Sequence, residues 1–267
     1  MEISNGYNIY MRQLKSRFGV KKHFFLCGIP RAGNTLFASL MMQNKKIAVT
    51  ANSITPDIIH EIYLLKNREV FQNFPDEESI DRAMVNAYHG YYSDWDYEFI
   101  LDRGPWGHPL NKTLLSYIFK ELKFVVLIRP VIEVIASFIK LEKPKNIHER
   151  IEVLMGRYGI ISGNLYSIKS LIDSNQKHVI VKYSDLVKQP NIEINKVCNF
   201  LNIPNFDIDV KNIKPFQINN IQYHDEKVGS INTHSLKSTI EKEDLTSTIK
   251  DLPQDVKDLA KAAELFF

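Results

Sequence analysis

Short apolar runs alternate along most of the chain with segments in which apolar residues recur every three or four positions. The apolar runs, which favour strands, lie at about 23–27, 47–51, 98–102, 124–128 and 178–183. The run at 124–128 is apolar at every position, as expected of a strand that is covered on both faces. Strands that alternate with helices predict a mainly parallel central sheet with helices on both sides.

The periodic segments predict the helices. They span about 35–43, 55–65, 76–92, 109–121, 131–140, 146–173 and 192–201. Thr55-Pro56-Asp57 is a typical helix start, with a hydroxyl cap, a proline in the first turn and then an acid. The longest segment, 146–173, is predicted as one helix that could be interrupted near its glycines, Gly156, Gly159 and Gly163.

The periodic pattern disappears from 202 to 243, where polar residues, proline and asparagine dominate. We expect a loop there that forms a flap over a site at the sheet. A short amphipathic helix is predicted at 252–267. No linker or repeat divides the chain, so we expect a single domain over 1–267, with its core at about 23–203 and the flap and last helix at about 204–267.

Composition and charge restrict the kinds of partner. The 267 residues are 44% hydrophobic and 24% charged, which is ordinary for a soluble globular protein. A net charge of +3, from 34 basic and 31 acidic residues, is too balanced to favour nucleic-acid binding. Cys27 and Cys198 have no disulfide or metal-ligand spacing, so no metal is expected. No signal peptide or membrane-spanning segment is apparent, and we expect a cytoplasmic protein.

The most informative segment is the turn that joins the first strand to the first helix. Gly28 and Gly33 lie five positions apart, and Thr35 follows. Backbone N–H groups and the positive end of a helix converge in such a turn and bind phosphate or a similar anion. The spacing resembles that of P-loop proteins, but Asn34 stands where ATPases and GTPases have lysine. The fixed charge lies upstream, at Arg31, so a 5′-phosphate that carries another transferable group fits better than a γ-phosphate.

Three arginines each follow the end of a predicted strand: Arg31, Arg103 and Arg129. Ligand sites of parallel sheets lie at the carboxyl ends of the strands, so we expect these side chains to share one rim of a three-layer, P-loop-like α/β fold. Ser137 lies eight residues after Arg129, about two helical turns further along. A guanidinium fork and a hydroxyl in this arrangement can hold a second anionic group.

With these positions the chain resembles sulfotransferases that use 3′-phosphoadenosine 5′-phosphosulfate (PAPS), and within that superfamily the tyrosylprotein sulfotransferases most of all. Residues 30–36 are similar to the family's 5′-phosphosulfate loop, proline-arginine-serine-glycine-threonine-threonine-leucine. Arg129 and Ser137 resemble the arginine–serine pair that holds the 3′-phosphate. Residues 181–187 resemble a strand-end tyrosine segment of that group. The resemblance covers about 23–200.

The resemblance implies a role for each matching residue. Arg129 and Ser137 would hold the 3′-phosphate, and Tyr183 would contact the donor. Lys227, with Gly229 and Ser230, resembles a late basic loop that closes over the 3′-phosphate. The residues that would hold the 5′-phosphosulfate are Arg31, Ala32, Gly33, Asn34, Thr35 and Leu36.

Catalysis of sulfuryl transfer requires stabilisation of the negative charge that builds on the oxygen bridging sulfur to the leaving phosphate. Fixed cations should supply most of it, and Arg31 is the first candidate. By resemblance, Arg103 stands where the family has a catalytic lysine. Its role would be electrostatic, because an arginine keeps its proton.

The general base is where the chain departs from the family's pattern. The family's glutamate would fall near Asn52, and an amide does not accept a proton at neutral pH. Asp57, His60 and His108 are the alternatives, with Glu61 nearby. For His108 the reason is that cytosolic members of the superfamily use a histidine from the equivalent region.

The predicted function is transfer of a sulfuryl group from PAPS to a hydroxyl or amine by in-line displacement. The acceptor could be a small molecule, a glycan or a peptide. A P-loop small-molecule kinase is one alternative, disfavoured by Asn34 and by the lack of a magnesium-binding aspartate after the strand at 124–128. A non-catalytic nucleotide binder is the other, favoured by Asn52. We expect no nucleic-acid partner, and the oligomeric state is open.

Overall fold

The computed structural model describes residues 21–50, 52–215, 217–222, 224 and 238–264 of the chain. Its centre is a five-stranded sheet in the order β2-β3-β1-β4-β5, in which all neighbouring strands are parallel. The strands are β1 (Lys22–Gly28), β2 (Ile47–Val49), β3 (Phe99–Arg103), β4 (Phe124–Ile128) and β5 (His178–Lys182). The predicted α/β fold with a mainly parallel sheet is confirmed.

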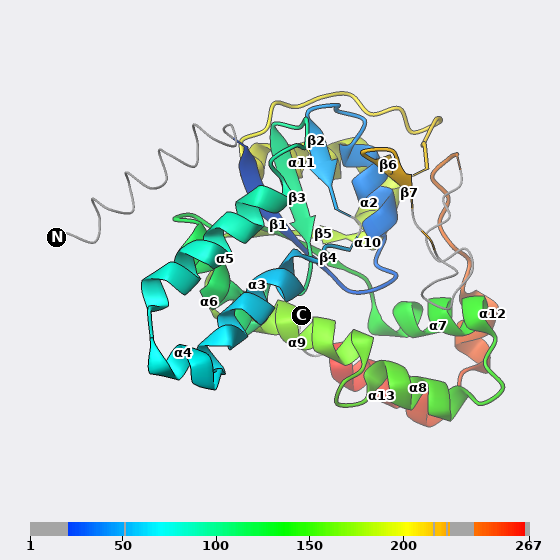
Figure 1. Cartoon of the computed structure of the whole chain (residues 1–267). Helices are drawn as coiled ribbons and strands as arrows, with labels where there is room; N and C mark the ends of the chain where they lie inside the picture. The colour runs from blue at the N-terminus through cyan, green and yellow to red at the C-terminus, as the bar shows by residue number, and fades with distance from the viewer. Residues whose placement is uncertain (1–20, 51, 216, 223, 225–237, 265–267) are drawn as a thin grey trace.

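Helices lie on both sides of this sheet (Figure 1). They are α2 (Asn34–Met41), α3 (Thr55–Leu64), α4 (Glu69–Asn73), α5 (Glu77–Tyr91), α6 (Pro109–Ile118), α7 (Val131–Glu142), α8 (Ile147–Met155), α9 (Ile160–Asp173), α10 (Tyr183–Lys188), α11 (Pro190–Leu201), α12 (Thr246–Asp251) and α13 (Gln254–Glu264). A 3-10 turn, η1 (Leu65–Asn67), follows α3. A short antiparallel pair, β6 (Gln217–Ile218) and β7 (Ile221–Gln222), lies in the predicted loop region.

The central strands form because helices cover their apolar side chains from both faces. In β1, Phe25 and Leu26 are fully buried, and in β4 every residue from Phe124 to Leu127 is. A strand with two covered faces needs no polar side, which explains the unbroken apolar run of β4.

Two helical predictions need correction. The segment 146–173 is not one helix, because α8 ends at Met155 and α9 starts at Ile160. The chain is extended at Gly156, and a Cβ at Gly159 would lie 2.3 Å from the carbonyl oxygen of Leu154, so the break lies at these two glycines. Gly163 lies inside α9 and does not interrupt it.

The end of the chain also differs from the expected single helix at 252–267. Helical structure begins earlier, at Thr246, and is divided by Pro253 into α12 and α13. Both helices pack against α7, at the end of the sheet where α8 also lies (Figure 1). The segment that leads into α12 is therefore attached to α7.

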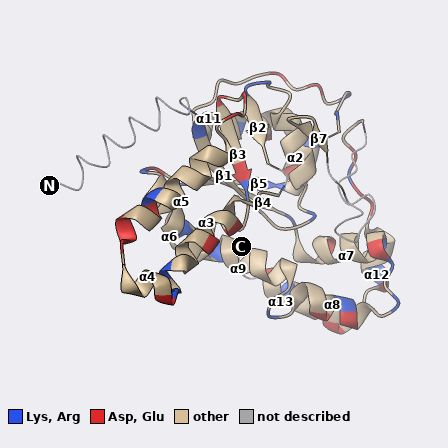
Figure 2. Cartoon of the chain, in the orientation of Figure 1, with Lys and Arg blue, Asp and Glu red and all other residues tan. Residues whose placement is uncertain are grey.

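Figure 2 shows lysine and arginine interspersed with aspartate and glutamate along the helices of the described ranges. Within the same ranges, no helix has the length and apolarity needed to cross a membrane. No group of three histidine, cysteine, aspartate or glutamate residues in them could hold a metal ion.

Candidate functional site

Three adjacent strands bring the predicted arginines to one edge of the sheet. β1 pairs with β3 on one side and with β4 on the other. Arg103 is the last residue of β3, Arg129 directly follows β4, and Arg31 lies in the turn after β1. The carboxyl ends of parallel strands face the same way, so the three residues start from one rim.

The turn after β1 depends on two glycines. The side chain of Asn34 points inward, and its Nδ2 donates a hydrogen bond to the carbonyl oxygen of Ile29 at 2.8 Å. A Cβ at Gly28 would lie 1.9 Å from Oδ1 of Asn34. Gly33 has a φ of +84°, and a Cβ there would lie 2.7 Å from the ring of Tyr183. Asn34 therefore supports the turn from inside, which the sequence did not indicate.

The turn leads directly into α2. Gly33 is its N-cap residue and makes no side-chain capping bond. The first N–H groups of a helix have no partner within it, so they can bind an anion. Thr35 and Leu36 are partly exposed here, whereas Ala32 is buried and its N–H donates to Ile29 at 3.1 Å.

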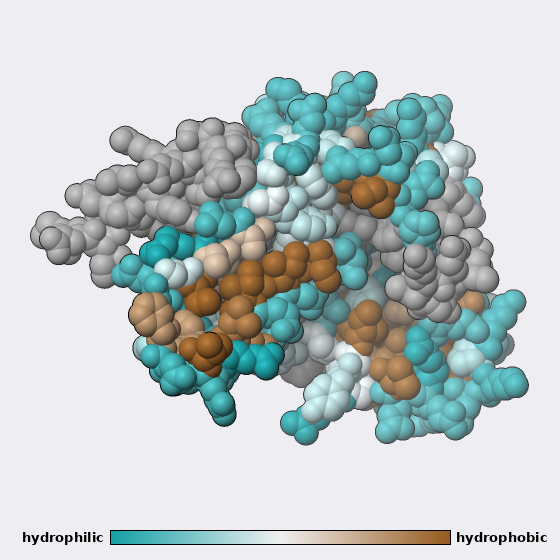
Figure 3. All heavy atoms as spheres, in the orientation of Figure 1, coloured by the Kyte–Doolittle hydropathy of each residue, from teal (hydrophilic) through white to brown (hydrophobic). Residues whose placement is uncertain are grey.

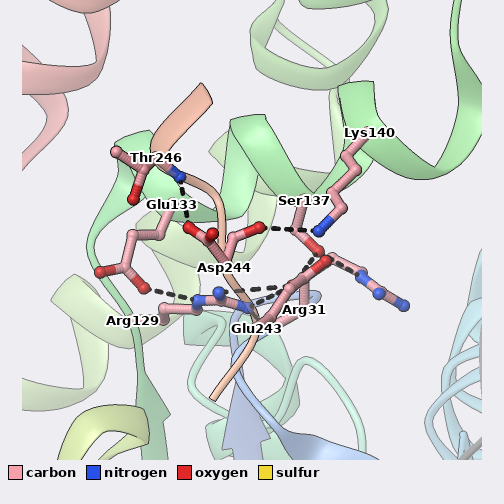
Figure 4. Close-up of polar contacts among 8 residues, drawn as sticks. All are labelled: Arg31, Arg129, Glu133, Ser137, Lys140, Glu243, Asp244 and Thr246. Atoms are coloured by element: carbon pink, nitrogen blue, oxygen red, sulfur yellow. Dashed lines mark hydrogen bonds and ion pairs between the residues drawn. The ribbon is translucent and has the colours of Figure 1, made fainter. Parts of the chain in front are cut away.

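Arg129 is held from several sides, and only 5% of it is exposed. Its Nε donates to Glu133 at 3.0 Å, and its Nη1 donates to the backbone carbonyl of Arg31 at 2.9 Å (Figure 4). Its Cζ lies 4.2 Å from the centre of the Tyr183 ring. The ring of Tyr183 thus lies between the turn at Gly33 and the guanidinium of Arg129. These contacts fix the guanidinium while its charge is buried.

Ser137 contacts Arg31 directly and is connected to Arg129 through Glu243. Its fully buried hydroxyl accepts a hydrogen bond from Nε of Arg31 at 3.1 Å and donates one to Oε2 of Glu243 at 3.0 Å. The same Glu243 oxygen lies 3.4 Å from Nη1 and from Nη2 of Arg129. Burial lowers the pKa of Arg31, and the charge of Glu243 acts in the opposite direction. We name Arg31, Arg129 and Ser137 the anion clamp.

The acidic members of this cluster were not predicted. Glu133 lies in the first turn of α7, where an acid is common, and Glu243 is more than 100 positions away from Arg129 and Ser137. No local pattern at Glu243 indicates this contact. The predicted Lys227 lies outside the described residues.

Arg103 is positioned through its buried neighbour Asp102. The carboxylate of Asp102 accepts hydrogen bonds from the hydroxyls of Thr50 at 3.3 Å, Thr55 at 2.6 Å and Tyr88 at 3.0 Å. Thr50 Oγ1 also accepts the backbone N–H of Arg103 at 2.6 Å. Burial raises the pKa of Asp102, and the hydroxyl donors oppose this shift. The network fixes the backbone of Arg103 at the end of β3.

Replacing Asp102 with alanine is expected to destabilise the chain by about 2–3 kcal/mol, because buried hydroxyls of Thr55 and Tyr88 lose their acceptor. Urea unfolding measures this, and wild-type stability in Asp102→Ala would contradict it. Asp102→Asn keeps an acceptor oxygen and should lose less.

The stability that Asp102 provides should also depend on pH. Because folding raises the pKa of Asp102, its contribution to the free energy of unfolding is largest at low pH and falls as the pH rises through the raised pKa. The difference between wild type and Asp102→Asn should therefore narrow with rising pH.

The candidate bases lie on α3 and at the start of α6. Burial, and next the charge of His60, lower the pKa of His108. The ring centre of His108 lies 5.6 Å from that of Tyr166. Asp57 is exposed in the first turn of α3, and Asn52 is exposed just before that helix. Asp57, His60 and His108 all remain predicted bases.

Apolar surface lies beside these candidates. Figure 3 shows apolar side chains gathered over α3 and α4. Three of the exposed ones are Ile54 at 50%, Val70 at 78% and Phe74 at 76%. Singly exposed apolar residues are ordinary, but several on adjoining segments are typical of a binding surface.

Comparison with known structures identifies chains of the same fold. The sulfotransferase domain of the Synechococcus PCC 7002 olefin synthase matches with a TM-score of 0.54 and 20% identity, covering 91% of this chain and 94% of that one. Sulfotransferase STF9 from Mycobacterium avium matches with a TM-score of 0.51 and 10% identity, covering 98% and 80%. Retinol dehydratase in complex with androsterone and the inactive cofactor PAP matches with a TM-score of 0.50 and 13% identity, covering 95% and 83%.

Comparison with curated proteins finds no match. The finer resemblance to tyrosylprotein sulfotransferases, the single domain over 1–267 and the cytoplasmic location remain predictions.

The family comparison is decisive for the broader class. The Sulfotransferase family matches residues 23–207, a span that includes the turn after β1 and the anion clamp. The chain therefore belongs to the sulfotransferase family.

Proposed function

We propose that the chain transfers a sulfuryl group from PAPS to a hydroxyl or amine of an acceptor. The observation that carries this proposal is the anion clamp beside the N-terminus of α2. PAPS carries a 3′-phosphate and a 5′-phosphosulfate, so it needs two anion sites at one edge of the sheet. A retinol dehydratase of the same fold binds PAP, the 3′,5′-bisphosphate that PAPS leaves after transfer, which supports the same donor here.

In the proposed reaction, an acceptor oxygen or nitrogen attacks the sulfur of PAPS. The bond between sulfur and the bridging oxygen of the 5′-phosphate breaks, and the 3′,5′-bisphosphate leaves with that electron pair. The acceptor proton passes to a base, for which Asp57, His60 and His108 are the candidates. Charge on the leaving oxygen is stabilised by Arg103, by Arg31 and by the N–H groups at the start of α2.

The residues of the clamp have different roles in this proposal. Arg129 supplies the fork for the 3′-phosphate, and Ser137 adds a hydroxyl. Tyr183 stacks on Arg129 and keeps it in place, whether or not it also touches the donor. Arg31 belongs to the turn and its side chain reaches Ser137, so it connects the two proposed anion sites. The apolar surface over α3 and α4 favours an acceptor with an apolar part (Figure 3).

Binding of the product PAP tests the donor. The purified chain should bind PAP about 100-fold more tightly than ADP or AMP, because only PAP carries a 3′-phosphate for the clamp. Calorimetric titration without magnesium measures all three ligands. Equal affinities would overturn the proposal.

Two further outcomes would redirect the assignment. Turnover of ATP that depends on magnesium would favour a kinase. Binding of PAPS without transfer to any acceptor in a broad screen would favour a non-catalytic binder, as the amide at Asn52 allows.

A further inference from the structure

A carboxylate from a distant part of the chain contacts the anion clamp. Glu243 faces both outer nitrogens of Arg129 and accepts the hydroxyl proton of Ser137 (Figure 4). An oxygen of a bound phosphate would make the same contacts with a guanidinium fork and a hydroxyl. Glu243 therefore occupies the position that an anionic ligand of the clamp would take.

The chain around Glu243 holds it at this position. The neighbouring carbonyl of Asp244 accepts a hydrogen bond from Nζ of Lys140 at 2.7 Å, and Leu245 is buried, with 4% of it exposed. Oδ1 of Asp244 accepts the N–H of Thr246 at 3.0 Å, at the start of α12. The segment is thus fastened to α7 by contacts outside the clamp, and these deliver the Glu243 side chain to it.

A second carboxylate, Glu133, contacts Arg129 differently. Glu133 follows Arg129 by four residues, in the first turn of α7. It accepts a hydrogen bond at 3.0 Å from Nε, the guanidinium nitrogen nearest to the backbone of Arg129. Glu243, by contrast, contacts Nη1 and Nη2 of Arg129 and the hydroxyl of Ser137. Glu133 therefore orients Arg129, whereas Glu243 occupies the face that a ligand needs.

A phosphate and the Glu243 carboxylate exclude each other at this face. Both are anions, and two like charges at contact distance repel strongly when they are partly removed from water. Both would also need the single hydroxyl proton of Ser137. Binding of a phosphate therefore requires Glu243 to leave.

We propose that Glu243 is an internal ligand of the anion clamp that competes with the 3′-phosphate of the donor. This inference rests on the proposed function for the identity of the donor. A pocket of about 280 Å³, lined by Glu133, Ile249 and residues 242–246, adjoins Glu243 and gives its side chain space to move. The apparent affinity of the clamp for a phosphate is then its intrinsic affinity multiplied by the fraction of molecules in which Glu243 has left it.

Removal of the Glu243 side chain tests the competition. If Glu243 occupies the clamp in about nine of ten molecules, Glu243→Ala should bind PAP and inorganic phosphate about tenfold more tightly than wild type. Calorimetric titration of the full chain with each of the two ligands gives the affinities. Glu243→Gln, which is close in shape, serves if the alanine variant does not fold, and should also bind more tightly.

Glu133→Gln is the matched control, because it removes the same charge from the same guanidinium without freeing the ligand face. It should not tighten binding of either ligand. Equal tightening in Glu133→Gln and Glu243→Ala would mean that charge alone acts, and would overturn the proposal. Unchanged affinities in Glu243→Ala would overturn it as well.

The two ligands separate this proposal from that of the donor. Tighter phosphate binding in Glu243→Ala, with no PAP binding in any variant, would support competition by Glu243 and overturn PAPS as the donor. PAP binding that is equal in wild type and Glu243→Ala would leave the donor in place and remove Glu243 as a competitor.

Discussion

Replacement of Arg129 by alanine should weaken PAP binding about 100-fold, a loss of about 3 kcal/mol. The guanidinium is almost fully buried and held by Glu133, Tyr183 and the backbone of Arg31, so its fork needs little reorganisation to meet a phosphate. Without it, the 3′-phosphate would be left in a partly dehydrated site with one fewer cation. Calorimetric titration with PAP measures the loss.

Arg129→Lys distinguishes charge from geometry. A lysine keeps the charge but has no planar fork, so its affinity should lie between those of wild type and Arg129→Ala. Arg150→Ala is a matched control, because Arg150 lies on α8 and outside the clamp. Its Nε and Nη2 both donate to the carboxylate of Glu142, so it is also an arginine paired with an acid. It should bind PAP as wild type does. Wild-type affinity in Arg129→Ala would show that this arginine does not hold the donor.

Replacement of Arg103 by alanine should lower kcat by about 10²–10³ and leave PAP affinity within a few fold of wild type. Arg103 ends β3, next to the turn after β1, and its backbone is fixed through Thr50 and Asp102. Its charge is proposed to act on the leaving oxygen, where negative charge grows only during the reaction, so the rate should suffer more than ground-state binding. Initial rates with PAPS, and titration with PAP, measure the two effects.

Arg103→Lys should recover part of the rate, because the lysine restores a cation at the same strand end. Arg82→Ala, on α5 and ion-paired with Glu78, is the surface control and should keep the wild-type rate. A loss of PAP affinity in Arg103→Ala equal to its loss of kcat/KM would instead assign Arg103 to binding.

Much of the fold follows from local sequence. The apolar run of β4 and the turn at Gly28 and Gly33 predicted the sheet and the position of its ligand edge, because side-chain burial and backbone conformation are local properties. The rim of three arginines also follows, since each directly succeeds a strand. In a parallel sheet the carboxyl ends of neighbouring strands lie at the same edge. Because the strand order is β3-β1-β4, Arg103, Arg31 and Arg129 follow one another along that edge.

The contacts within the site were harder to predict. The side chain of Asn34 points inward because Gly28 has no Cβ and leaves it space. The spacing of residues in the sequence does not reveal this close approach between Gly28 and Asn34. Arg31 reached Ser137, which the sequence had paired with Arg129 only. Glu243 is brought to the clamp by the packing of the chain before α12 against α7, and such packing depends on residues far apart in the sequence.

The order of the strands also limits the size of the ligand. Neighbouring strands in a sheet lie about 4.8 Å apart, so the backbones at Arg103 and Arg129, which end β3 and follow β4 with β1 between them, are separated by roughly 10 Å. The guanidinium of Arg129 is held on its own side of this rim by Glu133, Tyr183 and the backbone carbonyl of Arg31. A molecule with a charged group at each end can therefore engage Arg129 with one group and Arg103 with the other, so the width of the sheet favours an elongated ligand.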